Sequence, residues 1–279
     1  MKIHALQTGT VRCKQFQLTG ASNILSRFYQ LAFTDKWGEW MPTYCWLIEH
    51  PEGLILVDTG ETANIYEKGY LPDGGLYHKA VQTRIEANQE IPHQLAKIGF
   101  APKDIKTIIL THLHGDHIGG LSHFEHCKIY VGKAEYEQAI SKKGPGNGYF
   151  KKNWPTWFQP ALLTYTDGGE GNFGSSQKIT TDGKIVVVPT PGHSIGHQSI
   201  LVKKEDFTTI LAGDLTYNET TLKLEIADVV LMNKSAKQTV KAMHQYVKNN
   251  PSVYLSSHDW NAPDNLKNSK IYKEELIVI

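Results

Sequence analysis

The clearest pattern along the chain is a series of short apolar runs that are rich in β-branched residues and bounded by Gly, Pro or polar residues. Runs of this kind predict buried strands. In the first part of the chain they cover residues 43–50, 53–60 and 104–112. The first two runs are joined by Pro51-Glu52-Gly53, which predicts a hairpin turn.

Further along the chain the same pattern returns, and helical patterns stand between the runs. Strands are predicted over residues 128–132, 184–190, 197–204, 207–214 and 252–258. Helices are predicted over residues 83–99, 133–141 and 235–249. Hairpin-linked strands with helices between them favour an α/β (α+β) fold of two mixed sheets packed face to face with helices outside, over a doubly wound parallel sheet.

Residues 142–178 interrupt this pattern, because they are rich in Gly, Lys, Asn and Trp and show little periodicity. Loops of this length in compact domains are often lids or binding loops. A disordered insertion is the alternative, but Trp154 and Trp157 argue against it because disordered segments are poor in aromatic residues. We predict a lid or substrate loop within a single domain that spans residues 1–279.

Composition and charge exclude several classes of partner. Lys and Arg total 29 and Asp and Glu total 28, so the net charge is +1 and no global field favours nucleic acid or an anionic membrane. The sequence has no signal-like apolar region at its start and no run long enough to span a bilayer. Cys13, Cys45 and Cys127 are odd in number and far apart, which argues against a disulfide framework and predicts a cytoplasmic location.

Candidate metal ligands follow the predicted strands, each at the point where a strand ends. They are His112, His114, Asp116, His117, His193, Asp214 and His258. One four-coordinate zinc ion cannot use seven ligands, whereas two ions can if one carboxylate bridges them. Imidazole and carboxylate without thiolate predict zinc, with cobalt, manganese or iron as alternatives. His123, His126 and His197 lack a supporting pattern and are interpreted as ordinary residues.

These motifs resemble those of the metallo-β-lactamase fold superfamily from about Thr43 to His258. THLHGDHIGG matches its HxHxDH motif, TPGHSIGH its second histidine motif, LAGD its bridging aspartate, and LILVDTG a further motif. The resemblance implies a four-layer αβ/βα sandwich with the metals at one edge of its sheets. It implies a first metal on His112, His114 and His193, a second on Asp116, His117 and His258, a bridging Asp214, and an Asp58 that orients one ligand through a hydrogen bond.

Three positions narrow the choice within that superfamily. Position 114 is His, unlike the HxExDH pattern of the diiron flavoprotein reductases. Position 214 is Asp, where class B β-lactamases place a Cys ligand. Tyr217 stands three residues after Asp214, which resembles the Asp-x-x-Tyr of the N-acyl homoserine lactonases. The absence of a basic track argues against RNA processing.

The resemblance implies a binuclear hydrolase that opens the ring of N-acyl homoserine lactones by attack of a metal-bridging hydroxide. Tyr217 would stabilise the oxyanion, and Asp116 would carry the proton to the departing alkoxide. Two aromatic groups offer walls for the acyl chain or, alternatively, core or homodimer contacts: Trp37, Trp40 and Met41, and Phe150, Trp154, Trp157 and Phe158. A thioesterase or phosphotriesterase-like hydrolase and a non-catalytic metal-binding protein are the alternatives.

Overall fold

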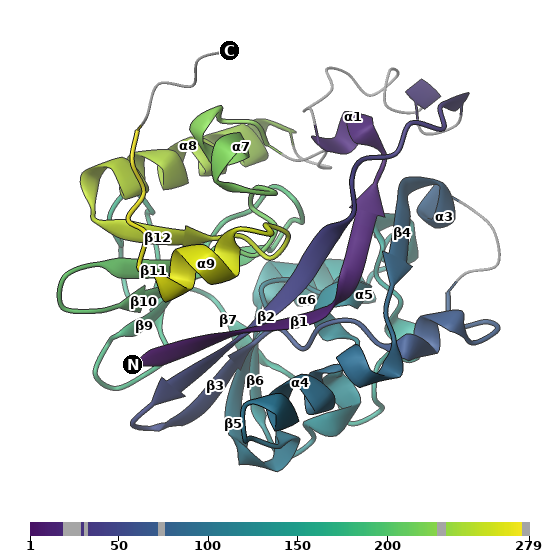
Figure 1. The fold of residues 1–279 in the computed structure, drawn as a ribbon, viewed down its shortest axis with the longest axis horizontal. Helices are drawn as coiled ribbons and strands as arrows, with labels where there is room; N and C mark the ends of the chain where they lie inside the picture. Colours follow the sequence, from purple (N-terminus) through teal and green to yellow (C-terminus); the bar gives the residue numbers. More distant parts are fainter. Residues whose placement is uncertain (19–28, 31–32, 72–75, 228–232, 275–279) are drawn as a thin grey trace. The chain divides into compact units, whose positions relative to one another are not determined.

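The chain divides into two compact units in a computed structural model, and each unit carries one β-sheet. The structure describes residues 1–18, 29–30, 33–71, 76–227 and 233–274. The first unit is Met1–Leu163 and the second is Thr164–Ile279. Figure 1 shows the strands and helices of each unit with their labels.

In the first unit, the described residues form a seven-stranded sheet in the order β4-β1-β2-β3-β5-β6-β7. Its four strands from β4 to β3 pair antiparallel, and the strands from β3 to β7 pair parallel, so the sheet is mixed. The strands are β1 (Lys2–Cys13), β2 (Met41–His50), β3 (Gly53–Val57), β4 (Val81–Arg84), β5 (Ile105–Ile109), β6 (Lys128–Gly132) and β7 (Ala161–Leu163).

Short helices connect these strands. The α-helices are α1 (Gln15–Leu18), α3 (Leu76–Ala80), α4 (Ile91–Lys97), α5 (Gly115–Ile118) and α6 (Lys133–Ile140). The 3₁₀ helices are η1 (Ala63–Tyr66), η2 (Ala87–Gln89), η3 (Pro102–Asp104), η4 (Leu121–His123), η5 (Pro145–Asn147) and η6 (Lys151–Asn153). His112 and His114 lie in the loop between β5 and α5, and Asp116 and His117 lie in α5.

In the second unit, the described residues form a five-stranded sheet in the order β12-β11-β10-β9-β8. The β11 and β12 strands pair parallel, and the other neighbours pair antiparallel. The strands are β8 (Gln177–Lys178), β9 (Ile185–Pro189), β10 (Gln198–Lys203), β11 (Thr208–Leu211) and β12 (Ser252–Leu255). The helices are α7 (Glu219–Lys223), α8 (Asn233–Asn249) and α9 (Ala262–Lys267).

The predicted strands are confirmed in both units, and so is the hairpin turn at Pro51-Glu52, where His50 pairs with Gly53. The helix predicted over 83–99 is wrong at its start. Residues 81–84 form β4, the edge strand that pairs with the end of β1, and the α-helix begins only at Ile91. Pro92 has no backbone N–H, so it suits the first turn of a helix and not its interior.

The predicted lid segment, 142–178, has short regular elements separated by irregular stretches. It contains η5, η6, β7 and β8, and its side chains Tyr149 and Phe158 belong to the hydrophobic core of the first unit. Trp154 and Trp157 are partly buried against the same core, which agrees with the alternative that these side chains make core contacts. At the other aromatic group, the guanidinium of Arg12 lies over the rings of Trp37 and Trp40.

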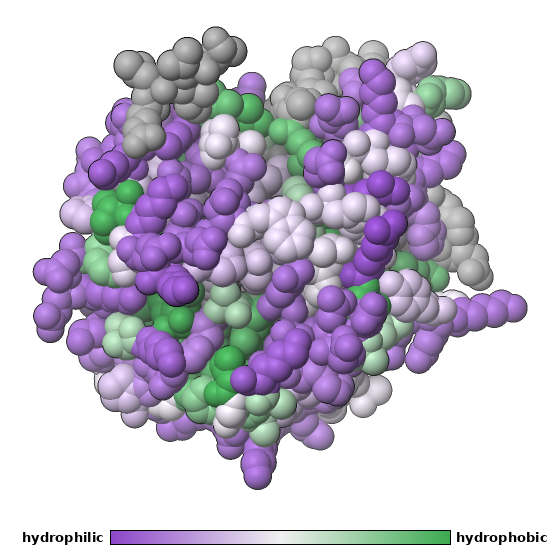
Figure 2. Space-filling model, viewed as in Figure 1, coloured by the Kyte–Doolittle hydropathy of each residue, from purple (hydrophilic) through white to green (hydrophobic). Residues whose placement is uncertain are grey.

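Three features of the chain concern its cysteines, its helices and its surface. All three cysteines are free thiols. Within the described ranges, no helix combines the length and the apolar character that crossing a bilayer requires. The face in Figure 2 is mainly hydrophilic, with small hydrophobic groups scattered over it.

Candidate metal centre

The candidate ligands of the first unit are organised by Asp58, which directly follows β3. Its carboxylate accepts hydrogen bonds from Thr111 N (2.7 Å), from the Thr111 hydroxyl (2.8 Å) and from Nδ1 of His117 (2.8 Å). Asp58 adopts a left-handed backbone conformation with φ of 60°, an uncommon state that Asp tolerates better than most residues. The hydrogen bond expected from Asp58 to a candidate ligand is therefore present, and it leaves Nε2 of His117 as the atom for a metal.

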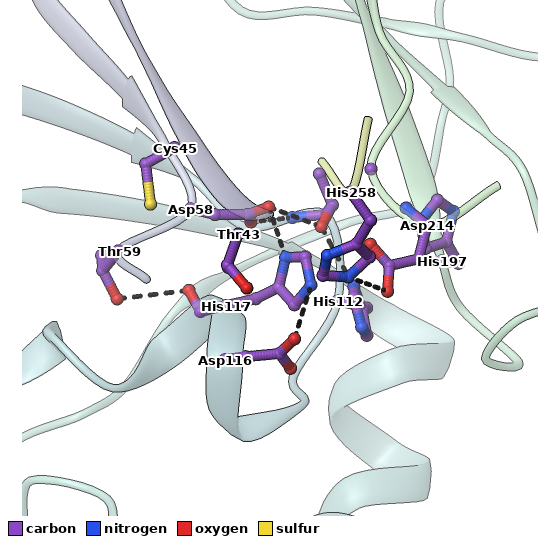
Figure 3. Close-up of polar contacts among 12 residues, drawn as sticks. Thr43, Cys45, Asp58, Thr59, His112, Asp116, His117, His197, Asp214 and His258 are labelled. Atoms are coloured by element: carbon purple, nitrogen blue, oxygen red, sulfur yellow. Dashed lines mark hydrogen bonds and ion pairs between the residues drawn. The ribbon is translucent and has the colours of Figure 1, made fainter. Parts of the chain in front are cut away.

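Close packing of α5 against the segment after β3 places His117. The N–H of Gly119 donates to the carbonyl of Gly60 over 2.6 Å, and the His117 carbonyl accepts the Thr59 N–H over 2.7 Å and also the Thr59 hydroxyl (Figure 3). A Cβ at position 119 would lie 2.7 Å from the backbone nitrogen of Thr62, so only glycine fits there. Gly120, the second glycine of the HxHxDHxGG pattern, also lies too close to its neighbours for a Cβ.

Three histidine rings gather in the first unit. The ring centroid of His112 lies 4.6 Å from that of His114 and 4.1 Å from that of His117. The carboxylate of Asp116 lies 3.7 Å from Nε2 of His117 (Figure 3). The first unit thus brings together all four candidate ligands of the HxHxDH motif.

Two contacts with other segments hold this loop. Glu135 of α6 is fully buried and accepts the Leu113 N–H over 3.0 Å. Nε2 of His114 lies 3.0 Å from the Asn147 carbonyl, and the His114 ring lies 5.2 Å from that of Tyr149. Asn147 and Tyr149 belong to the segment predicted as a lid, so this segment touches a candidate ligand. Sequence reasoning did not identify Glu135, because a single Glu in a predicted helix carries no signal.

The second unit carries its candidate ligands on the loops that follow β9, β11 and β12, of which β11 and β12 are parallel neighbours. The Ser257 N–H donates to the Gly213 carbonyl over 3.1 Å, which ties these loops together. Nε2 of His258 then lies 3.1 Å from Oδ2 of Asp214, and Nε2 of His193 lies 3.5 Å from the same oxygen. In the second unit, the two candidate histidines therefore converge on one carboxylate oxygen of the third candidate ligand, Asp214.

His197 has a positioning role that sequence reasoning missed. Its Nε2 accepts the backbone N–H of Asp214 over 3.0 Å, and its Nδ1 lies 2.8 Å from the Thr190 hydroxyl. The interpretation of His197 as an ordinary residue is therefore wrong, because the side chain fixes the backbone of a candidate ligand. Its place in TPGHSIGH, four residues after His193, is the signal that could have identified it.

Tyr217 lies beside a candidate ligand of the second unit. Its ring centroid is 6.3 Å from that of His258 at an interplanar angle of 40°. The turn between Asp214 and α7 is held by Thr216, whose carbonyl accepts the Ser256 hydroxyl over 2.5 Å and whose own hydroxyl lies 2.9 Å from that of Tyr254. The phenol of Tyr217 thus stands beside one candidate ligand and three residues from another.

A buried carboxyl, Glu61, follows the same strand end as Asp58. Its side chain is 2% exposed and accepts the Thr62 N–H over 3.0 Å. Burial, and to a smaller extent the charge of Asp116, raises the pKa of Glu61 to about 8. No pattern in the sequence pointed to this residue.

The donor sets of the two units fit divalent metal ions. The observation that tests the fit is the convergence of imidazole nitrogens and a carboxylate oxygen in the second unit, together with the Asp58 contact that leaves Nε2 of His117 for a metal. Nitrogen and oxygen donors without thiolate suit zinc and other first-row ions. Hydrogen bonds from carboxylates to ligand histidines are typical of such centres.

The motif order and this geometry agree with one protein family. A family model described as the Metallo-beta-lactamase superfamily matches residues 38–258. The chain belongs to the metallo-β-lactamase superfamily. The membership predicted from the HxHxDH pattern is thereby confirmed.

Known proteins and structures are similar to this chain over most of its length. The chain is 27% identical to the N-acyl homoserine lactonase AiiA of Bacillus thuringiensis subsp. kurstaki over 226 residues, which cover 78% of this chain and 82% of AiiA. It is similar in structure to an N-acyl homoserine lactone hydrolase with the product N-hexanoyl-L-homoserine bound at its catalytic metal centre, with a TM-score of 0.76, 23% identity and 95% of both chains covered. It is also similar to AidC, a dizinc quorum-quenching lactonase, with a TM-score of 0.63, 17% identity and coverage of 93% of this chain and 88% of AidC.

The structural likenesses establish the fold at these identities and nothing more. They confirm the predicted fold class, the α/β metallo-β-lactamase fold. The mixed sheet and associated helices of each unit agree with it.

Proposed function

We propose that this member of the metallo-β-lactamase superfamily is a metal-dependent hydrolase that opens the lactone ring of N-acyl homoserine lactones. The observation that carries the proposal is the position of Tyr217 beside His258, in a unit that also holds Asp214 and His193. The curated relative AiiA, which is named as a lactonase of this class, supports the same substrate.

Two divalent ions would be held by the seven candidate ligands. His112, His114 and His193 would bind the first ion, Asp116, His117 and His258 the second, and Asp214 both. When bound, such ions supply an activated water as nucleophile and polarise the lactone carbonyl. We propose zinc as the metal, since AidC is a dizinc lactonase and the donors are nitrogen and oxygen.

The residues of the chain contribute the remaining chemistry. The phenol of Tyr217 donates a hydrogen bond to the lactone carbonyl oxygen as that oxygen becomes anionic. This bond lowers the activation barrier because it is stronger in the transition state than in the ground state. Asp116 takes the proton of the attacking water and delivers it to the ring oxygen as it leaves. Asp58 and His197 are positioning residues, because they act through His117 and Asp214.

We also propose that residues 1–279 work as a single domain. The support is that each unit holds only part of the donor set, so neither unit alone would bind two ions. The segment 142–178 is proposed to cover the substrate, since Asn147 and Tyr149 contact His114. A cytoplasmic location and homodimer formation stay predictions.

The test compares three substrates at equal enzyme concentration with and without a chelator. We expect ring opening of N-acyl homoserine lactones to exceed hydrolysis of lactoylglutathione and of a phosphotriester by at least about 100-fold in kcat/KM. We also expect chelation to abolish it, zinc to restore it, and elemental analysis to give two ions per chain. Preferred hydrolysis of the thioester or the phosphotriester would instead support the alternative hydrolase.

A further inference from the structure

A cavity in the first unit has a buried carboxyl in its wall that the proposed reaction does not use. Its volume is about 70 Å³, and the lining residues used below are Glu61, Tyr70, Tyr77, Leu113, Gly115 and Phe150. Leu113 and Gly115 flank His114 in the HxHxDH loop, so the cavity adjoins the segment that carries four candidate ligands. All residues that line it belong to Met1–Leu163.

The carboxyl of Glu61 has capacity for a further hydrogen bond. Among the residues that the structure describes, its one hydrogen bond is from Thr62 N to Oε1. Tyr70 and Tyr77 line the same cavity as Glu61. Burial first, and the charge of Glu61 second, raise the pKa values of both phenols. A carboxylate oxygen can accept more than one hydrogen bond, so a ligand hydroxyl in the cavity can donate to Glu61.

Other parts of the cavity lining are apolar or lack a side chain. The Phe150 ring packs edge-on against that of Tyr77, with centroids 5.0 Å apart. Gly115 has no side chain, and a Cβ built there would meet no atom within 4 Å. The cavity therefore combines one hydrogen-bonding wall with space for a few carbon atoms.

The volume limits the size of the occupant. A volume of 70 Å³ is several times the roughly 10–15 Å³ that a cavity needs to hold one water, so the cavity has room for a short group of a few atoms. Beyond its carbonyl, a 3-hydroxybutanoyl group has three carbons and one oxygen. An octanoyl chain has seven carbons there and exceeds the space.

We propose that this cavity binds the acyl group of the lactone and selects short acyl chains with a 3-hydroxyl group, through a hydrogen bond between that hydroxyl and Glu61. The inference rests on the proposed lactonase function. A hydroxyl can donate to Glu61 whether the carboxyl is charged or neutral, so the recognition does not depend on its protonation. An unsubstituted alkyl chain would leave the carboxyl unsatisfied, which is the usual basis of strong discrimination by a buried polar group.

The experiment measures kcat/KM for N-butanoyl, N-(3-hydroxybutanoyl) and N-octanoyl homoserine lactone with the zinc-loaded full chain. For the wild type we expect the 3-hydroxybutanoyl substrate to be preferred over the butanoyl substrate about tenfold, the effect of one buried hydrogen bond. In Glu61→Leu this ratio should fall to about 1, because Leu cannot accept a hydrogen bond. Glu61→Gln should retain most of it, since an amide oxygen accepts as well.

Two further variants separate this role from a structural one. Glu125→Gln changes an exposed carboxyl of the same unit and should leave the ratio unchanged. Gly115→Val fills the cavity and should lower kcat/KM for both butanoyl substrates about tenfold relative to N-acetyl homoserine lactone. Metal content and far-UV circular dichroism confirm that each variant is folded and loaded.

The outcomes distinguish the two proposals. A wild type that opens none of the lactones refutes the lactonase function and the inference with it. A wild type that opens them, with a ratio that Glu61→Leu leaves unchanged or with equal losses for all acyl chains, refutes only the hydroxyl recognition by Glu61.

Discussion

Asp58 and His117, which are 59 positions apart in the chain, are joined by a hydrogen bond of 2.8 Å between the carboxylate and Nδ1 of the ring. Both side chains are at most 1% exposed. The bond selects the tautomer in which Nε2 is left for a metal ion. The geometry of the candidate centre therefore depends on a residue that is not itself a ligand.

Asp58→Asn should weaken metal binding about 10–100-fold, the usual cost of losing such a carboxylate partner. Asn keeps the size of the side chain and tolerates the left-handed backbone at this position. Competition with a chromophoric chelator measures the affinity. Asp206→Asn, at an exposed carboxylate, is the matched control. Equal affinity in Asp58→Asn and the wild type would contradict the orienting role.

Tyr217→Phe should lower kcat for lactone opening about 100-fold and change KM little, because the phenol is proposed to donate only as the oxyanion forms. The metal content should stay at the wild-type value, which separates a role toward the substrate from a role in the metal centre. Steady-state kinetics on metal-loaded protein provides the measurement. Tyr130→Phe, a half-buried phenol in β6, should have wild-type kinetics. Full activity of Tyr217→Phe would eliminate the phenol from the reaction.

Gly119→Ala should destabilise the protein by about 2–3 kcal/mol, because the new Cβ meets backbone atoms that cannot move independently. It would lie 2.7 Å from Thr62 N and 2.8 Å from the Gly60 carbonyl oxygen. Thermal unfolding should show a Tm roughly 4–10 °C lower than that of the wild type. Gly115→Ala, at a helix position with no atom within 4 Å of its Cβ, should show no decrease. Equal Tm values for the two variants would show that α5 does not pack as described.

Glu61 should make the metal-free protein less stable as the pH rises. Its pKa is about 8 in the folded state, above the ordinary value of 4.5, so the folded state binds the extra proton between these values. The free energy of unfolding of the wild type, taken relative to that of Glu61→Gln, is therefore highest below pH 4.5. It falls by about 4 kcal/mol between pH 4.5 and pH 8. Urea unfolding at pH 5, 6.5 and 8 with a chelator measures the difference. A difference that stays constant or changes in the opposite direction would show that Glu61 is charged throughout.

The sequence by itself determined the elements whose signals are local. The buried strands β2, β3, β5, β6 and β9 to β12 were predicted from their apolar runs, because a strand that is covered on both faces needs nothing but a short β-branched sequence. The candidate ligands could be named for a similar reason. His112, Asp214 and His258 each follow a strand end, and their spacing to neighbouring ligands and glycines is a local pattern.

Only the tertiary structure decided the contacts that join distant segments. The strand β4 exists because residues 81–84 pair with the end of β1, and their own sequence is equally compatible with a helix. His197, Glu135 and Glu61 have sequences around them that fit ordinary core or surface positions. Their roles come from what lies opposite: the Asp214 backbone, the Leu113 N–H and a cavity wall. The hydrogen bonds that such residues make, and the extent to which they are buried, depend on how the whole chain folds. No spacing within one segment encodes them.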